Sequence, residues 1–170
     1  DWLPLLTSAS CLGLLAFTRP LTAAAVALPF VFHGIYLFWR GERRTRLRLL
    51  VFCAVVLLLS SLILIWQFAV TGDPLLNPYT LWWKYDKIGF GPGFGHMPNG
   101  HSWTLARINT RHSLRFGWHD LFGWGSFSWI FLPLGGLALL LQRNWKGLAV
   151  ALVYPALVLL YLAYWIGSWL

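Results

Sequence analysis

Three arginines recur at every fourth position of the segment SWTLARINTRHSLRF, as Arg107, Arg111 and Arg115. On a helix, residues four positions apart share one face, so the three side chains are predicted to form a single basic stripe. Guanidinium groups bind phosphate well because their N–H groups match its oxygens in pairs. Two interpretations remain open: the stripe contacts anionic lipid headgroups, or it recognises a substrate lipid that carries a phosphate.

A second group of residues lies upstream, in the segment NPYTLWWKYDKIGFGPGFG. If a short helix begins near Asn77, then Tyr79, Trp82 and Trp83 lie on one of its faces. Such a face can anchor the chain in the membrane interface, or it can stack against the C–H groups of a sugar ring. The glycine run that follows does not predict a dinucleotide-binding loop, because the sequence shows no strand before it and no βαβ unit around it.

The sequence predicts no metal, no cofactor and no nucleic-acid partner. The four histidines between residues 96 and 119 lack the close spacing and the accompanying acids of a zinc site. The net charge is +8, but five of the thirteen basic residues fall within residues 40–48, between two apolar segments. That placement is typical of a membrane protein and not of a nucleic-acid-binding surface.

The elements that must position these residues are membrane helices. The chain is 58% hydrophobic and only 11% charged, against about 25% charged in soluble proteins. We therefore expect an all-α fold, a single polytopic transmembrane domain with about five transmembrane helices and one long external loop that contains short helices. The predicted spans are residues 2–17, 21–39, 49–70, 121–141 and 148–169, and the external loop is residues 71–120.

The charges between the spans predict the topology. Residues 40–48 contain five arginines and one glutamate, and residues 142–147 add Arg143 and Lys146 without an acid. Short basic loops stay on the cytoplasmic side, so both are assigned there. Alternation of the spans then places residues 71–120 outside, together with the Thr18-Arg19-Pro20 turn.

The order of several motifs resembles that of a known family. The motifs are TRPLTAAAVALPF, TGDPLLNPY, WWKYDKIGFGPG, GHSWTLARINTR and DLFGW. Their order is similar to that in membrane glycosyltransferases of the dolichyl-phosphate-mannose protein mannosyltransferase-like group (family 39, GT-C architecture), in particular bacterial members. The resemblance implies a multi-pass enzyme of the bacterial inner (plasma) membrane. Such an enzyme moves a sugar from a polyprenyl-phosphate carrier to an acceptor on the outer side.

The resemblance also implies roles for particular residues. Arg19 would hold the carrier phosphate and stabilise it as the leaving group, with Lys87 as a second phosphate contact. Asp86 would orient Lys87 or meet acceptor hydroxyl groups, beside Tyr85 in the cavity. The Trp82-Trp83 pair would contact the sugar or the lipid. At Ser102-Trp103 many relatives have Thr-Pro or Thr-Leu, so the identities of the donor sugar and the acceptor do not carry over.

The catalytic acid of the group lies in an outer loop that this sequence lacks. No catalytic residue is therefore assigned, and the chain is expected to be a fragment of a longer enzyme. The alternative hypothesis is a non-catalytic membrane subunit or scaffold whose external loop docks a partner.

Overall fold

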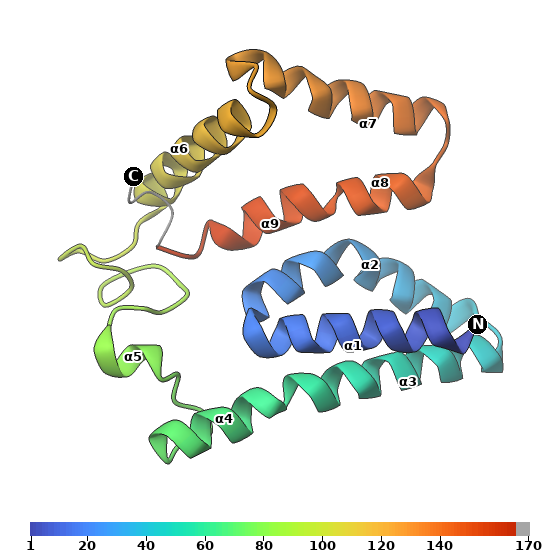
Figure 1. Cartoon of the computed structure of the whole chain (residues 1–170), viewed down its shortest axis with the longest axis horizontal. Helices are drawn as coiled ribbons and strands as arrows, with labels where there is room; N and C mark the ends of the chain where they lie inside the picture. The colour runs from blue at the N-terminus through green and yellow to red at the C-terminus, as the bar shows by residue number, and fades with distance from the viewer. Residues whose placement is uncertain (166–170) are drawn as a thin grey trace. The chain divides into compact units, whose positions relative to one another are not determined.

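A computed structural model describes residues 1–165, except for the side chains of residues 118–122, 126 and 129. Within this part of the chain the regular elements are helices and there is no β-strand (Figure 1). Two isolated bridges join Ile88 to Tyr164 and Gly91 to His101. The all-α prediction is thereby confirmed. The chain divides into two units, Asp1–Pro78 and Tyr79–Leu170.

The first unit consists of helices that fold back on one another. They are α1 (Trp2–Thr18), α2 (Pro20–Arg40), α3 (Arg43–Ser60) and α4 (Leu62–Thr71). In Figure 1, α2 runs opposite to α1 and α3, so the turn at Arg19 and the turn at residues 41–42 lie at opposite ends of α2. With 21 residues, α2 is about 31 Å long at 1.5 Å per residue.

Local chemistry explains the two turns. Pro20 is the first residue of α2, where its missing N–H and fixed φ suit a helix start, and Arg19 before it has an extended backbone (φ −143°, ψ 76°). At the other end, Arg46 donates from Nε to the carbonyl of Gly41 (3.1 Å) and from Nη2 to that of Trp39 (3.2 Å). Arg46 therefore fastens the start of α3 to the end of α2.

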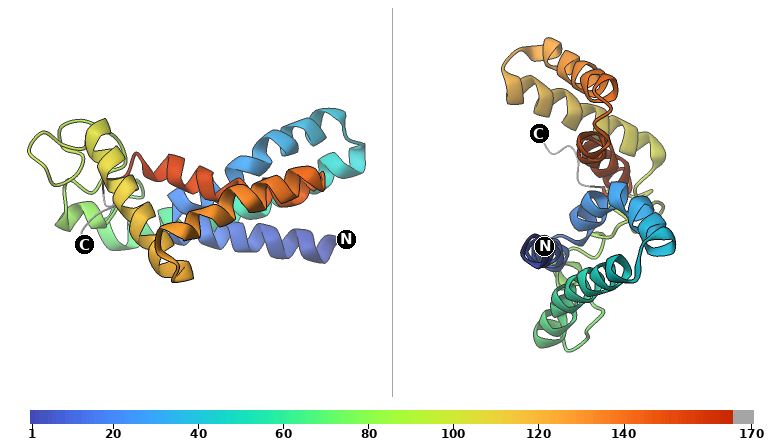
Figure 2. Two further views of the ribbon diagram at one scale, coloured as in Figure 1. Left: turned by 90° about the horizontal axis from the view of Figure 1, so that it is seen from above. Right: turned by 90° about the vertical axis from the view of Figure 1, so that its right-hand side faces the viewer.

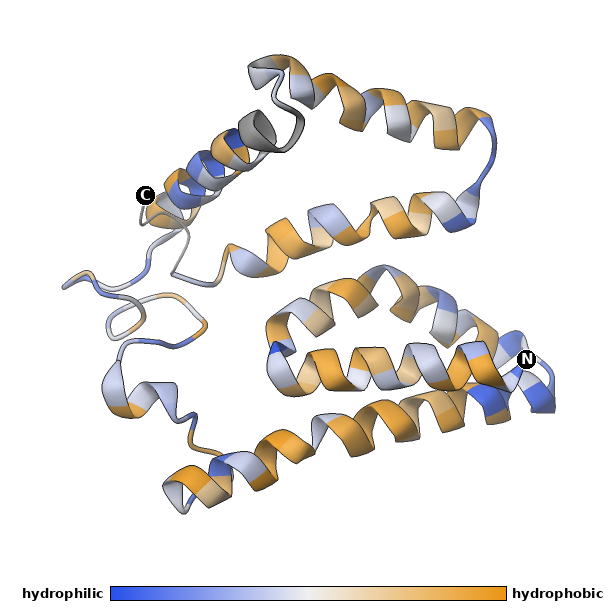
Figure 3. Cartoon of the chain, in the orientation of Figure 1, coloured by the Kyte–Doolittle hydropathy of each residue, from blue (hydrophilic) through white to orange (hydrophobic). Residues whose placement is uncertain are grey.

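The interior of the first unit contains small residues. Its buried hydrophobic side chains are those of Ala9, Ala23 and Ala25, and Gly13 is buried as well. Many large apolar side chains of α2, α3 and α4 are exposed and none is buried. Figure 3 shows that these helices are predominantly hydrophobic along their length. Soluble domains bury Leu, Ile and Phe instead, whereas small residues at helix contacts are typical of membrane helices.

Two stretches among the described residues are long and apolar enough to cross a membrane, Pro20–Arg40 and the nearly continuous α3–α4 stretch Arg43–Thr71. Shorter apolar helices cover Trp2–Thr18, Phe131–Leu141 and Trp145–Tyr161. α2 therefore covers the predicted span at 21–39, and the 29-residue α3–α4 stretch contains the predicted span at 49–70 but begins six residues earlier. α1 (Trp2–Thr18) covers the predicted span 2–17, whereas the predicted spans 121–141 and 148–169 correspond to shorter helices.

The second unit begins with a short helix and a long loop. Its elements are α5 (Tyr79–Trp82), α6 (Trp103–Phe122), the 3₁₀ helix η1 (Gly125–Ile130), α7 (Phe131–Leu141), α8 (Trp145–Ala151) and α9 (Val153–Tyr161). α7 and α8 form a hairpin (Figure 2). The sequence predicted short helices between residues 71 and 120, but α6 has 20 residues. The Ser102 side chain caps this helix by accepting a hydrogen bond from the Leu105 N–H (3.2 Å).

The apolar segment 121–141 does not form one helix. α6 ends at Gly123, whose φ of +66° belongs to the left-handed region that favours glycine, and η1 precedes α7. The predicted helix at 148–169 also differs, since α8 ends at Ala151 and α9 at Tyr161. Pro155 lacks the N–H that would bond back to α8, which explains a break before it. Residues 166–169 of that prediction lie outside the described residues.

Candidate functional site

The arginines of α6 line a groove in the second unit. Arg107, Arg111 and Arg115 lie along it, and Val158 and Leu162 from the end of α9 form part of its opposite wall. Its volume is about 1000 Å³. The regular helix from Trp103 onward brings the three arginines together, because a four-residue step returns to nearly the same face.

The positive charge of this groove is not neutralised within the part of the chain that the structure describes. The side chains of Arg107, Arg111 and Arg115 are exposed and make no ion pair or hydrogen bond there. Like charges one helical turn apart repel one another, so the bare stripe is less stable than one bearing an anion. The groove is thus suited electrostatically to a negatively charged ligand.

The remaining lining of the groove is largely apolar. Ile108 and Leu114 of α6 contribute to it, as do Val158 and Leu162. A groove with guanidinium groups along one wall and aliphatic side chains along another fits an amphipathic anion. The phosphate of such a ligand can take paired hydrogen bonds from arginine, and its hydrocarbon chain can lie against the aliphatic wall.

The loop before α6 is fastened to the segment that follows α9. One carboxylate oxygen of Asp86, Oδ1, accepts hydrogen bonds from the Tyr164 hydroxyl and from Nε1 of Trp165, each 3.0 Å long. Burial, followed by the hydrogen bond to Asp86 and the negative charge of that residue, raises the pKa of Tyr164 to about 12. Tyr164 lies beyond the end of α9, and it remains a hydrogen-bond donor at neutral pH.

Further hydrogen bonds, from the backbone and from an imidazole ring, also link this loop to the residues after α9. The Gly89 N–H donates to the carbonyl of Ala163 (2.8 Å), and Nε2 of His101 lies 2.9 Å from the carbonyl oxygen of Leu162. His101 is 2% exposed and stacks on Phe90 with ring centroids 5.1 Å apart. The buried imidazole therefore has a structural role here, linking the loop to the residues after α9.

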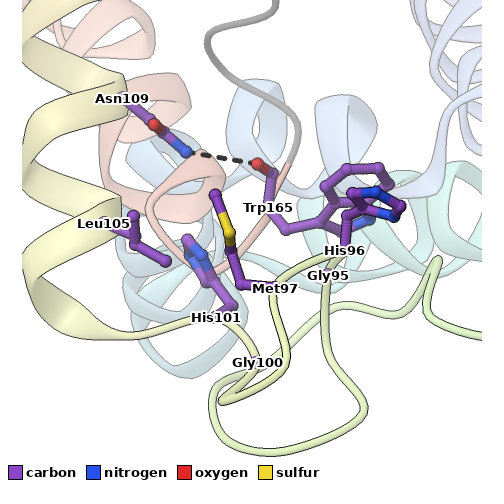
Figure 4. A pocket seen from close by; sticks show the side chains of 8 residues that line it. All are labelled: Gly95, His96, Met97, Gly100, His101, Leu105, Asn109 and Trp165. Carbon is purple, nitrogen blue, oxygen red and sulfur yellow. Dashed lines mark hydrogen bonds between the residues drawn. The ribbon is translucent and has the colours of Figure 1, made fainter.

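A small pocket of about 200 Å³ lies where the loop, α6 and Trp165 meet (Figure 4). Asn109 of α6 donates from Nδ2 to the carbonyl of Trp165 (3.2 Å), as the dashed line in Figure 4 marks. Gly95 has a φ of +80°, and a Cβ atom there would lie 2.8 Å from Cβ of Trp165. Only glycine fits that close approach. The pocket is smaller than the roughly 300–1,000 Å³ of drug-sized ligand sites.

The aromatic and charged residues predicted near the loop have different surroundings. Trp82 is 82% exposed on α5, whereas Trp83 stacks on Tyr79 with ring centroids 6.3 Å apart. Tyr85 makes edge contacts with His96 (5.1 Å) and Trp165 (5.2 Å). Lys87 is exposed and makes no ion pair with Asp86. Asp86 thus contacts Tyr164 and Trp165 instead of orienting Lys87.

Arg19 belongs to the first unit, at the turn between α1 and α2. Its N–H donates to the carbonyl of Leu15 (2.6 Å), and its own carbonyl accepts from the Ala23 N–H (3.0 Å). The backbone of Arg19 therefore ends one helix and starts the next, and its side chain is exposed.

Sequence reasoning did not identify Tyr164, Trp165, His101 and Asn109 as parts of this site. The contacts of Asp86 with Tyr164 and Trp165 span 78 and 79 residues, and those of His101 and Asn109 span 61 and 56. No local pattern encodes such distant partners. The one available signal was the polar character of Asp86 among aromatic residues.

Comparisons of this chain with protein-family models, with curated proteins and with solved structures found no match.

Proposed function

We propose that this chain is part of an integral-membrane glycosyltransferase. The enzyme takes a sugar from a polyprenyl-phosphate carrier and transfers it to an acceptor on the outer face of a bacterial plasma membrane. The observation that carries the proposal is the groove of α6, with unpaired arginines on one side and Val158 and Leu162 on the other. A polyprenyl phosphate has the matching chemistry, a phosphate group joined to a long hydrocarbon chain.

The packing of the first unit supports a membrane location. Alanine and glycine lie in its interior while many large apolar side chains are exposed, an arrangement that apolar surroundings favour. The length of α2, about 31 Å, matches the roughly 30 Å hydrocarbon core of a bilayer. A polytopic chain with additional, shorter spans is part of the proposal.

The two turns at the ends of α2 support an orientation. The segment 40–48, which contains the turn between α2 and α3 and the start of α3, carries five arginines and is assigned to the cytoplasmic side. The turn at Arg19, at the opposite end of α2, then faces outward. In the proposed enzyme Lys87, which belongs to the same unit as α6, is a further contact for the carrier phosphate.

The proposed chemistry assigns the arginines to binding and to leaving-group stabilisation. Negative charge grows on the carrier phosphate as its bond to the sugar breaks, and fixed guanidinium groups at that oxygen lower the barrier. In the proposed enzyme Arg107 and Arg111 have this role. The base that activates the acceptor hydroxyl is not assigned within this chain, because Oδ1 of Asp86 already accepts two hydrogen bonds.

Sugar transfer by the reconstituted protein tests the proposal. Membranes that contain the protein are supplied with ¹⁴C-labelled hexoses linked to polyprenyl phosphate, and transfer of label to membrane components is measured. Arg111→Gln should lower the rate at subsaturating donor by roughly ten- to a hundredfold, because a hydrogen bond to a charged group contributes about 1.5–3 kcal/mol.

Arg143→Gln is the matched control, since Arg143 is also exposed but lies in the turn between α7 and α8. It should leave transfer unchanged. Equal transfer rates in Arg111→Gln and Arg143→Gln would show that the groove does not bind the sugar donor. If the wild-type protein transfers no sugar at all, the proposed activity is refuted.

A further inference from the structure

The turn between α2 and α3 and the start of α3 carry positive charge that no acid among the described residues neutralises by an ion pair. Residues 40–48 hold five arginines against Glu42 alone. Arg46 is the one arginine among them that donates side-chain hydrogen bonds to residues the structure describes, and these bonds close the turn. The other four arginines therefore do not hold this turn closed.

Arg48 has a buried donor without an acceptor. Its Cζ atom lies 5.8 Å from the centroid of the Trp2 ring, a cation–π contact that holds the guanidinium in place. Its Nε atom is shielded from solvent and has no hydrogen-bond partner among the described residues. Because this Nε is shielded, an anion would have to bind the accessible remainder of the half-buried Arg48 guanidinium.

Arg44 lies one helical turn before Arg48 on the same face of α3. Its side chain is exposed and makes no ion pair among the described residues. Arg44 lies in the first turn of this 18-residue helix, whose N-cap residue is Glu42. The helix dipole disfavours a cation at that end and favours an anion, so a bound anion would stabilise Arg44 there.

We propose that Arg44 and Arg48, beside Trp2, bind the phosphate of an anionic phospholipid. The neighbouring surface favours a lipid over a soluble anion, because Leu47, which lies about 60° from Arg44 around the helix, is 53% exposed. Tryptophan commonly lies at the level of lipid headgroups, which fits the position of Trp2. The site is separate from the sugar-transfer groove of α6, and its test does not depend on that activity.

Lipid retention tests this site. The protein is reconstituted in phosphatidylcholine nanodiscs that contain a minor amount of phosphatidylglycerol, and the phosphatidylglycerol bound to the released protein is measured by native mass spectrometry. Arg44→Gln and Arg48→Gln should each lower the bound fraction roughly fivefold, the effect expected for one arginine near a charged membrane surface. If Arg48→Gln does not fold, Arg44→Gln alone tests the proposal, because the Arg44 side chain is exposed.

Arg43→Gln is the matched control. Arg43 is exposed and adjacent to Arg44, but it points about 100° away around the helix. It should keep the wild-type amount of phosphatidylglycerol. An equal loss in Arg43→Gln would show diffuse attraction instead of a site, and no loss in any variant would refute binding. Displacement of the lipid by added inorganic phosphate would assign the site to the free anion and overturn the lipid proposal.

Discussion

Asp86 joins two parts of the second unit that are far apart in the sequence. Its Oδ1 atom accepts from Tyr164 and Trp165, and the same loop also reaches Ala163 through the N–H of Gly89. A carboxylate that receives two donors in a partly buried position contributes to the structure of the loop. We infer that its main effect on function is to hold the loop that precedes α6.

The pKa of Tyr164 provides a residue-scale prediction. Burial, the hydrogen bond to Asp86 and the charge of Asp86 raise this pKa to about 12. Asp86→Ala removes the last two causes, so the pKa should fall toward the ordinary value of about 10. The measurement is an ultraviolet absorbance titration of tyrosinate formation, read as the difference between the variant and the wild type.

The sign of the pH dependence follows from the raised pKa. The contribution of Tyr164 to stability is fully present below its unfolded pKa of about 10, and it is lost as the pH rises through about 12. Asp86→Ala should therefore show a smaller loss of stability over that range. Asp73→Ala is the control, because Asp73 bonds to the Leu75 N–H instead. Superimposable tyrosinate titrations of wild type and Asp86→Ala would contradict the assignment.

At the scale of elements, the contact between α1 and α3 depends on the absence of a side chain. A Cβ atom at Gly13 would lie 2.7 Å from Cβ of Leu59 and 3.2 Å from the carbonyl oxygen of Val56. Ala9 lies one turn earlier on α1 and is fully buried. Small residues four positions apart are a common helix contact in membranes, because they allow close backbone approach.

Gly13→Ala should therefore destabilise the first unit by about 1–3 kcal/mol, the usual cost of overpacking. Gly34→Ala is the matched control, since no atom lies within 4 Å of a Cβ there and alanine is a better helix former. Unfolding in mixed detergent micelles, followed by circular dichroism, measures both. Equal stability of the two variants would show that α1 and α3 do not pack through Gly13.

The first unit could be predicted from the sequence more fully than the second. Long apolar runs ending at Arg19-Pro20 and at the arginine-rich turn located α1, α2 and the α3–α4 stretch to within a few residues. Their limits are set by hydropathy and by proline, which are local properties. The breaks at Gly123 and before Pro155 were missed because apolar composition continues across both.

The candidate site could likewise be predicted only in part. The arginine stripe of α6 was predictable because a four-residue repeat has a direct meaning on a helix. The partners of Asp86 were not, since they lie 78 and 79 residues away. A role for Asp86 beside Lys87 was implied by the family resemblance, whereas in the fold the carboxylate accepts hydrogen bonds from Tyr164 and Trp165.

At the scale of the whole molecule, the charges and the apolar surface support one account. Large apolar side chains cover the first unit, arginines gather at one end of α2, and α6 carries the other basic stripe. We expect these two basic regions to face opposite sides of a membrane. The lipid site on α3 would then meet the inner leaflet and the groove of α6 would meet the outer leaflet.

Side-specific labelling of cysteines tests this two-sided arrangement most directly. Cys11 and Cys53 are replaced by alanine, and single cysteines are introduced as Glu42→Cys and Asn99→Cys, both at exposed positions. Intact cells are treated with a membrane-impermeant maleimide. We predict that the cysteine at position 99 reacts in intact cells and that the one at position 42 reacts only after the membrane is permeabilised. Reaction of both cysteines from the same side would contradict the account.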